Sequence, residues 1–309
     1  MKKWMMGVMA GVVVVVVALY VFIPKVITLK SSIGIKATRS GINRMLLDKN
    51  NTAKWWPGTI SNDSCYLNEF AYKINNGNIT VLPVSIHGKD NEVSTSLFLI
   101  SINTDSTHLE WVGSMVTSYN PVKRFLTYKK AKKINSDLSM ILEKMDKFYS
   151  QPENIYSFNI NKAKVIDSFL IATSAVHKGY PGDSYIYRLV DKLRLYAIAN
   201  TAKESGFPML NVSTRDSINF DVKVAIPVDK LLPSSGDILQ KRMLGRGNIL
   251  VAEVKGGVEI TNQAIEQMQK YVDDYQRKTP AIPFCSLITD RTKEPDSSKW
   301  VTKIYFPVM

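Results

Sequence analysis

The chain has 309 residues, of which 45% are hydrophobic and 22% charged. These values are ordinary for globular proteins and exclude a mostly disordered chain, and the length suits about two domains. The 40 Lys and Arg residues outnumber the 27 Asp and Glu residues and give a net charge of +13, which favours anionic partners. With two cysteines and three scattered histidines, the composition argues against a disulfide scaffold and a His-built metal site, so no cofactor is expected.

An apolar segment without charged residues covers residues 4–23. At about 1.5 Å rise per residue, a helix of this length matches a hydrocarbon core of about 30 Å. A cleaved signal peptide is the alternative, but it needs a shorter apolar region and a small-residue cleavage site. The segment therefore predicts a transmembrane anchor within residues 1–25 that contacts the lipid bilayer through residues 4–23. It implies a single-pass protein of the bacterial inner (plasma) membrane, with the soluble part weakly favoured outside the cytoplasm.

The next region, residues 26–150, is predicted to be a domain of strands closed by a long helix. The apolar periodicity predicts in turn a strand, a helix, two long strands and a final amphipathic helix, at residues 26–35, 39–48, 94–102, 109–117 and 127–149. Between the first helix and the strands lies the turn Lys54-Trp55-Trp56-Pro57. This order resembles the START-like (SRPBCC, polyketide-cyclase-like) helix-grip fold. The resemblance implies a sheet wrapped around the long helix and a cavity for a hydrophobic ligand. Without the resemblance, the two tryptophans could simply fill the core beneath the helix.

Residues 151–309 contain an internal repeat. The sequence of residues 221–228, Asp-Val-Lys-Val-Ala-Ile-Pro-Val, recurs 80 residues later as Val-Thr-Lys-Ile-Tyr-Phe-Pro-Val at residues 301–308. Upstream of each copy, a Lys-Gly element is followed by an amphipathic helix and then by a further strand. Each repeat, at about residues 160–230 and 240–309, therefore predicts a strand–helix–strand–strand unit.

Alternation along the repeated strand separates two faces. Val222, Val224 and Ile226 share one face, which should pack beneath the helix of the same repeat. Lys223 lies on the opposite face, as Lys303 does in the second copy. That face points to solvent or to the space that the two repeats enclose.

The tandem repeat ending in Pro-Val resembles the gyrase-inhibitor-like (GyrI-like) effector-binding domain, found also at the end of some AraC- and MerR-type regulators. The resemblance implies a pseudo-two-fold module with an aromatic-lined groove for amphipathic small molecules, and some relatives hydrolyse small electrophilic compounds. Family members often carry a ligand-facing glutamate at the position of Lys303, whose counterpart in the first repeat is Lys223. An ammonium replaces the carboxylate here, so we expect a preference for anionic or carbonyl-bearing ligands.

Further groove candidates are aromatic residues of the helices and the last strand, together with one acid beside the second Lys-Gly turn. The complete set of predicted ligand-binding residues is Lys223, Lys303, Tyr305, Trp300, Tyr187, Tyr271, Tyr275 and Glu253. Each has an alternative interpretation: solvated lysines, tyrosines packed in the core, and a surface glutamate.

The sequence thus predicts an α+β protein: a transmembrane helix, a helix-grip domain and a tandem GyrI-like domain. The predicted function is a non-enzymatic sensor or carrier that binds an amphipathic, effector or lipid-like small molecule, with no catalytic residues. The alternative is a hydrolase of small reactive compounds that uses Glu253 and a groove tyrosine as an acid–base pair. No helix-turn-helix, zinc spacing or RNA-binding signature is found in the sequence, so no nucleic-acid partner is expected, and protein partners are unknown.

Overall fold

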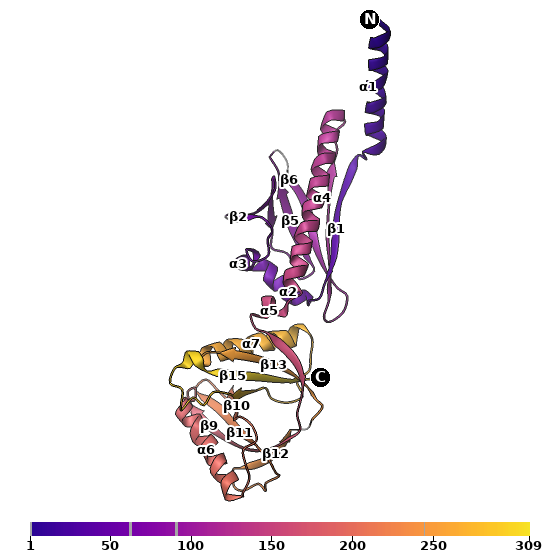
Figure 1. Ribbon diagram of the computed structural model, residues 1–309. Helices are drawn as coiled ribbons and strands as arrows, with labels where there is room; N and C mark the ends of the chain where they lie inside the picture. The colour runs from indigo at the N-terminus through magenta and orange to yellow at the C-terminus, as the bar shows by residue number, and fades with distance from the viewer. Residues whose placement is uncertain (1, 62–63, 90–91, 244) are drawn as a thin grey trace. The chain divides into compact units, whose positions relative to one another are not determined.

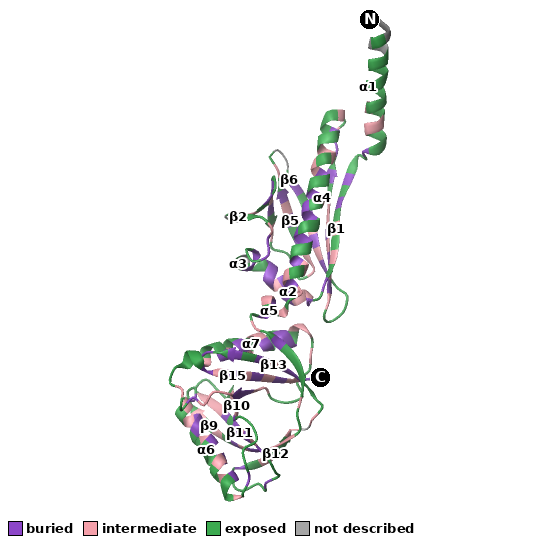
Figure 2. Cartoon of the chain, viewed as in Figure 1, coloured by how far each residue is buried: buried purple, intermediate pink, exposed green. Residues whose placement is uncertain are grey.

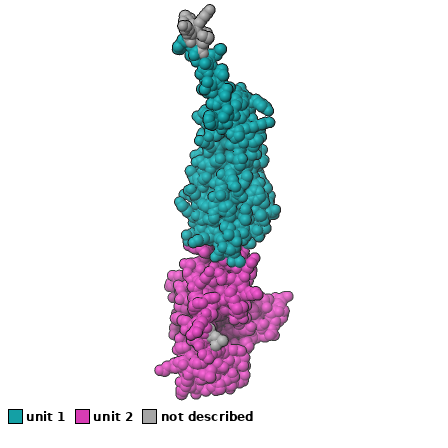
Figure 3. Space-filling model, turned by 90° about the vertical axis from the view of Figure 1, so that its right-hand side faces the viewer, with its two compact units in different colours: residues 1–151 teal, residues 152–309 magenta. Residues whose placement is uncertain are grey.

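A computed structural model describes residues 2–61, 64–89, 92–243 and 245–309. The chain divides into two compact units, Met1–Gln151 and Pro152–Met309 (Figure 3). Both units combine helices with an antiparallel sheet, so the mixed α+β class expected from the sequence is correct.

Unit 1 contains a seven-stranded antiparallel sheet with the strand order β1-β7-β6-β5-β4-β3-β2 (Figure 1). Its strands are β1 (Val26–Ile35), β2 (Thr59–Ser61), β3 (Ser64–Leu67), β4 (Phe70–Ile74), β5 (Val81–His87), β6 (Glu92–Ser101) and β7 (Thr107–Val116). Its helices are α1 (Lys2–Phe22), α2 (Arg39–Leu47), α3 (Lys49–Thr52) and α4 (Pro121–Tyr149). The first and last strands of unit 1, β1 and β7, lie side by side, and α4 packs along β1.

Helix α4 begins six residues earlier than the apolar stripe predicts, because a capping signal precedes that stripe. Asn120 Oδ1 accepts hydrogen bonds from the backbone N–H groups of Val122 and Lys123, at 3.0 and 3.1 Å. Pro121 occupies the first turn, where its missing N–H costs nothing. Further along, the stripe of Ile134 and Leu138 is fully buried, and Figure 2 shows the buried surface of α4 turned to the sheet.

Aromatic side chains fill the space between α4 and the sheet. Trp55 and Trp56 are buried, and Trp56 lies 5.5 Å from Tyr72 and Tyr72 lies 6.3 Å from Trp111, measured between ring centroids. Tyr72 donates a hydrogen bond of 2.9 Å to Asp137 of α4, a carboxylate that is buried with it. The tryptophans therefore pack in the core of unit 1.

The N-terminal apolar segment forms helix α1. No helix in the part of the chain that the structure describes combines the length and the apolar character needed to cross a membrane. The predicted transmembrane helix over residues 4–23 is therefore wrong. The single-pass inner-membrane localisation and the bilayer contact that depended on it have no support.

Unit 2 contains an eight-stranded antiparallel sheet with the order β12-β9-β11-β10-β14-β15-β13-β8. Its strands are β8 (Ile160–Lys164), β9 (Ser168–Lys178), β10 (Met209–Thr214), β11 (Asn219–Val228), β12 (Leu239–Met243), β13 (Asn248–Lys255), β14 (Phe284–Leu287) and β15 (Val301–Val308). Its helices are α5 (Pro152–Tyr156), α6 (Asp183–Ala199), α7 (Val258–Asp274) and the 3-10 turn η1 (Ser297–Lys299). The unit β9-α6-β10-β11 recurs as β13-α7-β14-β15, and the two copies meet where β10 pairs with β14.

The strand that precedes each repeat pairs with the other repeat. β8 comes directly before β9 in the chain but pairs with β13, whereas β12 comes directly before β13 but pairs with β9. This exchange adds a second tie between the repeats, besides the central pair of β10 and β14.

The sheet of unit 2 curls, and both α6 and α7 lie on its outer face (Figure 1). Val222, Val224 and Ile226 of β11 are buried on that face, where α6 packs against β11. Ile304 and Phe306 of β15 are buried equivalently in the second repeat, where α7 packs. We call the other face of the sheet the inner face; no helix in the described part of unit 2 packs over it. Figure 3 views this side and shows unit 2 hollowed there.

Candidate functional site

The inner face carries an aromatic pair near its centre. Phe284 of β14 and Tyr305 of β15 are register partners, and their rings stack with centroids 4.9 Å apart and planes inclined by 16°. Both residues are half-buried, so part of the stacked surface stays accessible. A flat aromatic surface of this kind suits the apolar part of an amphipathic molecule.

An ion pair lies beside this aromatic pair. Lys303 and Glu253 are register partners on β15 and β13, and the Lys303 Nζ atom lies 3.3 Å from a Glu253 carboxylate oxygen. The two side chains are 38% and 59% exposed, so water screens the pair and a ligand can reach it.

Lys223 lies on the same face but farther from the aromatic pair. It is exposed, and in register it pairs with Asn211 of β10 and Ser174 of β9. β11 is two strands from β14 and three from β15, which corresponds to about 10 and 14 Å along the sheet. A single small molecule that stacks on the aromatic pair therefore reaches Lys303 directly, and Lys223 only if it is elongated.

Four of the eight predicted residues do not lie on the inner face. Tyr187 of α6 and Tyr271 of α7 are buried at 3% and 4% exposure within the helical layer, and Tyr275 stacks on Tyr271 at 4.2 Å. Trp300 is buried just before β15, and its ring lies 4.7 Å from the Arg291 guanidinium. The structure thus brings Lys303, Tyr305 and Glu253 together, with Lys223 farther along the same face.

The sequence interpretation missed Phe284. The residue begins a strand of four residues, which is too short to show alternation, and its stacking partner is 21 positions away in the chain. Its apolar character after Pro283 was the available signal, and it did not identify the face on which the ring lies.

The inner face offers few groups for acid–base or metal chemistry. Glu253 is exposed and pairs with an ammonium group, and among the described residues no hydrogen bond links it to a tyrosine. No cluster of three or more His, Cys, Asp or Glu side chains in the described parts of the chain could hold a metal ion. The arrangement can stack an apolar group and attract a charged one.

Several solved structures resemble about half of this chain at low sequence identity. No family model matches the chain, and no curated protein matches it. The C-terminal domain of EcmrR is similar over 49% of this chain and 98% of its own, at 16% identity with a TM-score of 0.41. SAV2435, solved bound to tetraphenylphosphonium, is similar over 49% of this chain and 94% of its own, at 15% identity with a TM-score of 0.34. The Aha1 dimer from Colwellia psychrerythraea is similar over 40% of this chain and 96% of its own, at 16% identity with a TM-score of 0.32. Because these TM-scores lie below 0.5, the description of the fold rests on the strand order given above.

Proposed function

We propose that unit 2 is a GyrI-like module that binds an amphipathic, anionic small molecule on its inner face, without catalysing a reaction. The observation that carries this proposal is the stacked pair of Phe284 and Tyr305 with the Lys303 ammonium beside it. The aromatic surface would hold the apolar part of the ligand, and the lysines would attract its charged group.

The fold interpretation is supported by the duplicated strand–helix–strand–strand unit and by the place of both helices on one face of the sheet. The corresponding START-like interpretation of unit 1 stays a prediction, motivated by the neighbouring β1 and β7 and by the closing helix α4.

Binding is favoured over the alternative of a hydrolase by the state of Glu253. The proposed acid–base pair needs Glu253 within hydrogen-bond reach of a tyrosine in a closed pocket. Glu253 is instead 59% exposed and pairs with the Lys303 ammonium at 3.3 Å, and among the described residues no hydrogen bond links it to a tyrosine.

The proposal is tested by titrating the full chain with 1-naphthoate, an aromatic carboxylate, and with tetraphenylphosphonium, an aromatic cation, in a calorimeter. We expect 1-naphthoate to bind more tightly. Tyr305→Ala and Phe284→Ala each remove one ring of the stack, worth about 0.5–1.5 kcal/mol, so each should weaken naphthoate binding roughly two- to tenfold.

Tyr66→Ala is the matched control, because Tyr66 is an exposed tyrosine of unit 1. It should leave naphthoate affinity unchanged. If wild-type protein binds neither probe, or if Tyr305→Ala and Tyr66→Ala behave alike, the inner face is not the binding site.

A further inference from the structure

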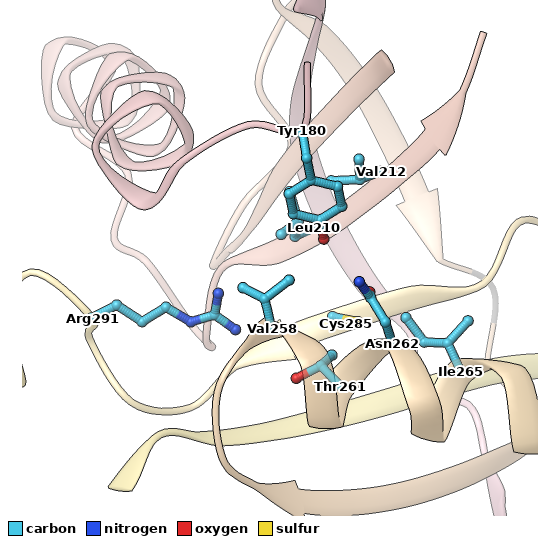
Figure 4. A pocket seen from close by; sticks show the side chains of 9 residues that line it. All are labelled: Tyr180, Leu210, Val212, Val258, Thr261, Asn262, Ile265, Cys285 and Arg291. Carbon is cyan, nitrogen blue, oxygen red and sulfur yellow. The ribbon is translucent and has the colours of Figure 1, made fainter. Parts of the chain in front are cut away.

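A second hollow lies on the outer face of unit 2, on the opposite side of the sheet from the proposed ligand site. It is a cavity of about 40 Å³ in the groove between the helices, above the central strands β10 and β14 (Figure 4). The lining side chains come from both repeats and are Tyr180, Leu210, Val212, Val258, Thr261, Asn262, Ile265, Cys285 and Arg291. The cavity has room for about three water molecules, or for a small organic molecule of similar size.

Differences in loop length between the two repeats create this cavity on one side of the groove. The loop from β14 to β15 covers residues 288–300, whereas its counterpart from β10 to β11 covers residues 215–218. The longer loop occupies the α6 side of the groove. There the Tyr187 hydroxyl accepts a hydrogen bond of 3.0 Å from the backbone N–H of Arg291 and donates one of 3.3 Å to the backbone carbonyl of Thr289. On the α7 side the loop of four residues does not fill the groove.

The longer loop also places a guanidinium group, ion-paired with Asp183, at the cavity wall. The Arg291 side chain is 4% exposed, and its guanidinium donates to Asp183 Oδ1 at 3.0 Å and to Thr302 Oγ1 at 3.2 Å. The Trp300 ring packs against it at 4.7 Å. These two hydrogen bonds use two of the five N–H groups of a guanidinium, so donors remain for a ligand. Among the described residues that line the cavity, Arg291 is the charged one.

Neutral polar groups face the guanidinium across the cavity. In Figure 4 the Tyr180 hydroxyl and the Asn262 amide point toward one another at the mouth. Burial raises the pKa of the Tyr180 hydroxyl, so it stays protonated and can donate a hydrogen bond. Val258 is the first residue of α7, whose N-cap Gly257 provides no side-chain cap, so the positive end of that helix adjoins the cavity.

The rest of the lining is apolar and includes Leu210, Val212 and Ile265. A molecule that matches both the guanidinium and the apolar lining carries a compact anionic group at one end and one or two carbon atoms at the other. A carboxylate matches the planar fork of a guanidinium better than a spherical anion does. We propose that this outer-face cavity binds a short-chain carboxylate, held by Arg291 and covered by Tyr180.

Tyr180 forms the cover of the site. It lies in the loop Gly179–Gly182, is 43% exposed, and packs edge-on against Phe220 at 5.7 Å between ring centroids. Gly179 has a φ of 77°, a conformation that favours glycine, and fixes the turn from which Tyr180 extends. The corresponding loop of the second repeat has two residues, Gly256 and Gly257, and carries no aromatic cover.

Cys285 provides a built-in reporter, because its thiol lines the cavity. In the full chain carrying Cys65→Ser, the rate at which methyl methanethiosulfonate modifies Cys285 is measured by intact-mass spectrometry at constant pH. Propionate should slow the modification, with half-maximal protection on the order of 1–10 mM, the range expected for a ligand of so few atoms. Propanol and propylammonium, which have the same carbon chain but no carboxylate, should not slow it.

Two variants test whether propionate binds in this cavity and whether the Arg291 guanidinium holds it. Val258→Phe fills the cavity and should abolish protection by propionate. Arg291→Lys keeps the charge but loses the fork and should weaken protection about tenfold. Tyr305→Ala, on the inner face, should leave protection unchanged, so this site and the proposed function can fail independently. Equal slowing by propanol, or no slowing at about 100 mM propionate, would show a cavity for water or apolar groups and overturn the proposal.

Discussion

Replacing Lys303 by methionine should change which charge the inner face prefers. Methionine keeps much of the length of the side chain but removes the ammonium group that lies 3.3 Å from Glu253. The Glu253 carboxylate then loses its partner beside the aromatic pair. We therefore expect Lys303→Met to weaken the binding of 1-naphthoate and to strengthen the binding of tetraphenylphosphonium.

The size of the effect follows from Coulomb's law. A ligand carboxylate about 4 Å from the Lys303 ammonium gains about 4 kcal/mol at an effective dielectric constant of 20 and about 1 kcal/mol in bulk water. The Lys303 side chain is 38% exposed and Glu253 offsets part of its charge, so the lower figure applies. A change of about 1 kcal/mol is roughly fivefold in each dissociation constant, and the ratio of the two constants should change roughly 25-fold.

Calorimetry at low salt measures both constants, because screening is then weak. Lys270→Met is the matched control, since Lys270 is an exposed lysine of α7 and its loss changes the net charge equally. Glu253→Gln should act in the opposite sense and strengthen naphthoate binding. If Lys303→Met and Lys270→Met change the ratio equally, the preference reflects the net charge of the chain and the reasoning from the ion pair is wrong.

Two further predictions concern the stability of unit 1, measured by hydrogen exchange of its peptides in urea. Tyr72→Phe removes the hydrogen bond to buried Asp137 and should cost about 1.5–3 kcal/mol at neutral pH. Burial raises the pKa of Asp137 and the Tyr72 hydroxyl lowers it, so the variant pKa is higher still. The loss of stability in Tyr72→Phe should therefore shrink as pH falls through the folded-state pKa of Asp137. A loss of stability that does not depend on pH would show that the hydrogen bond to ionised Asp137 is not its cause. Gly113→Ala places a Cβ 2.5 Å from Thr95 Cγ2 and should cost about 1–3 kcal/mol, whereas Gly34→Ala meets no atom within 4 Å; equal effects would refute the steric argument.

The sequence located the duplicated strands well, because alternation is a local property. The repeats at residues 221–228 and 301–308 fall within β11 and β15, and Val224 and Ile304 are buried as their face predicts. Strand order is different, because it depends on pairing between distant residues. β8 and β12 each pair with a strand of the other repeat, and a local sequence pattern contains no information about such pairing.

Helical spacing does not decide whether a tyrosine belongs to a ligand site. Tyr271 and Tyr275 lie on one side of α7, but spacing alone does not say whether that side faces the sheet or a ligand. In the structure Tyr271 is 4% exposed and stacks on Tyr275 within the helical layer. The assignment of these tyrosines to a ligand site stays a prediction. The transmembrane prediction from the N-terminal apolar segment was wrong, because the described helix there does not meet the requirements of a membrane span.

Duplication does not make the two inner-face lysines equivalent. Lys303 pairs in register with Glu253, whereas Lys223, at the matching position of the first repeat, pairs with Ser174. The positive charge of Lys303 is therefore partly offset before a ligand arrives, which is why its removal should cost about 1 kcal/mol and not the larger Coulomb figure. The hydroxyl group opposite Lys223 provides no such offset, but Lys223 lies about 10 Å from β14 across the sheet, since β11 is two strands away. A compact aromatic anion such as 1-naphthoate should therefore depend on Lys303, whereas Lys223 should matter only for elongated ligands whose charged group reaches it.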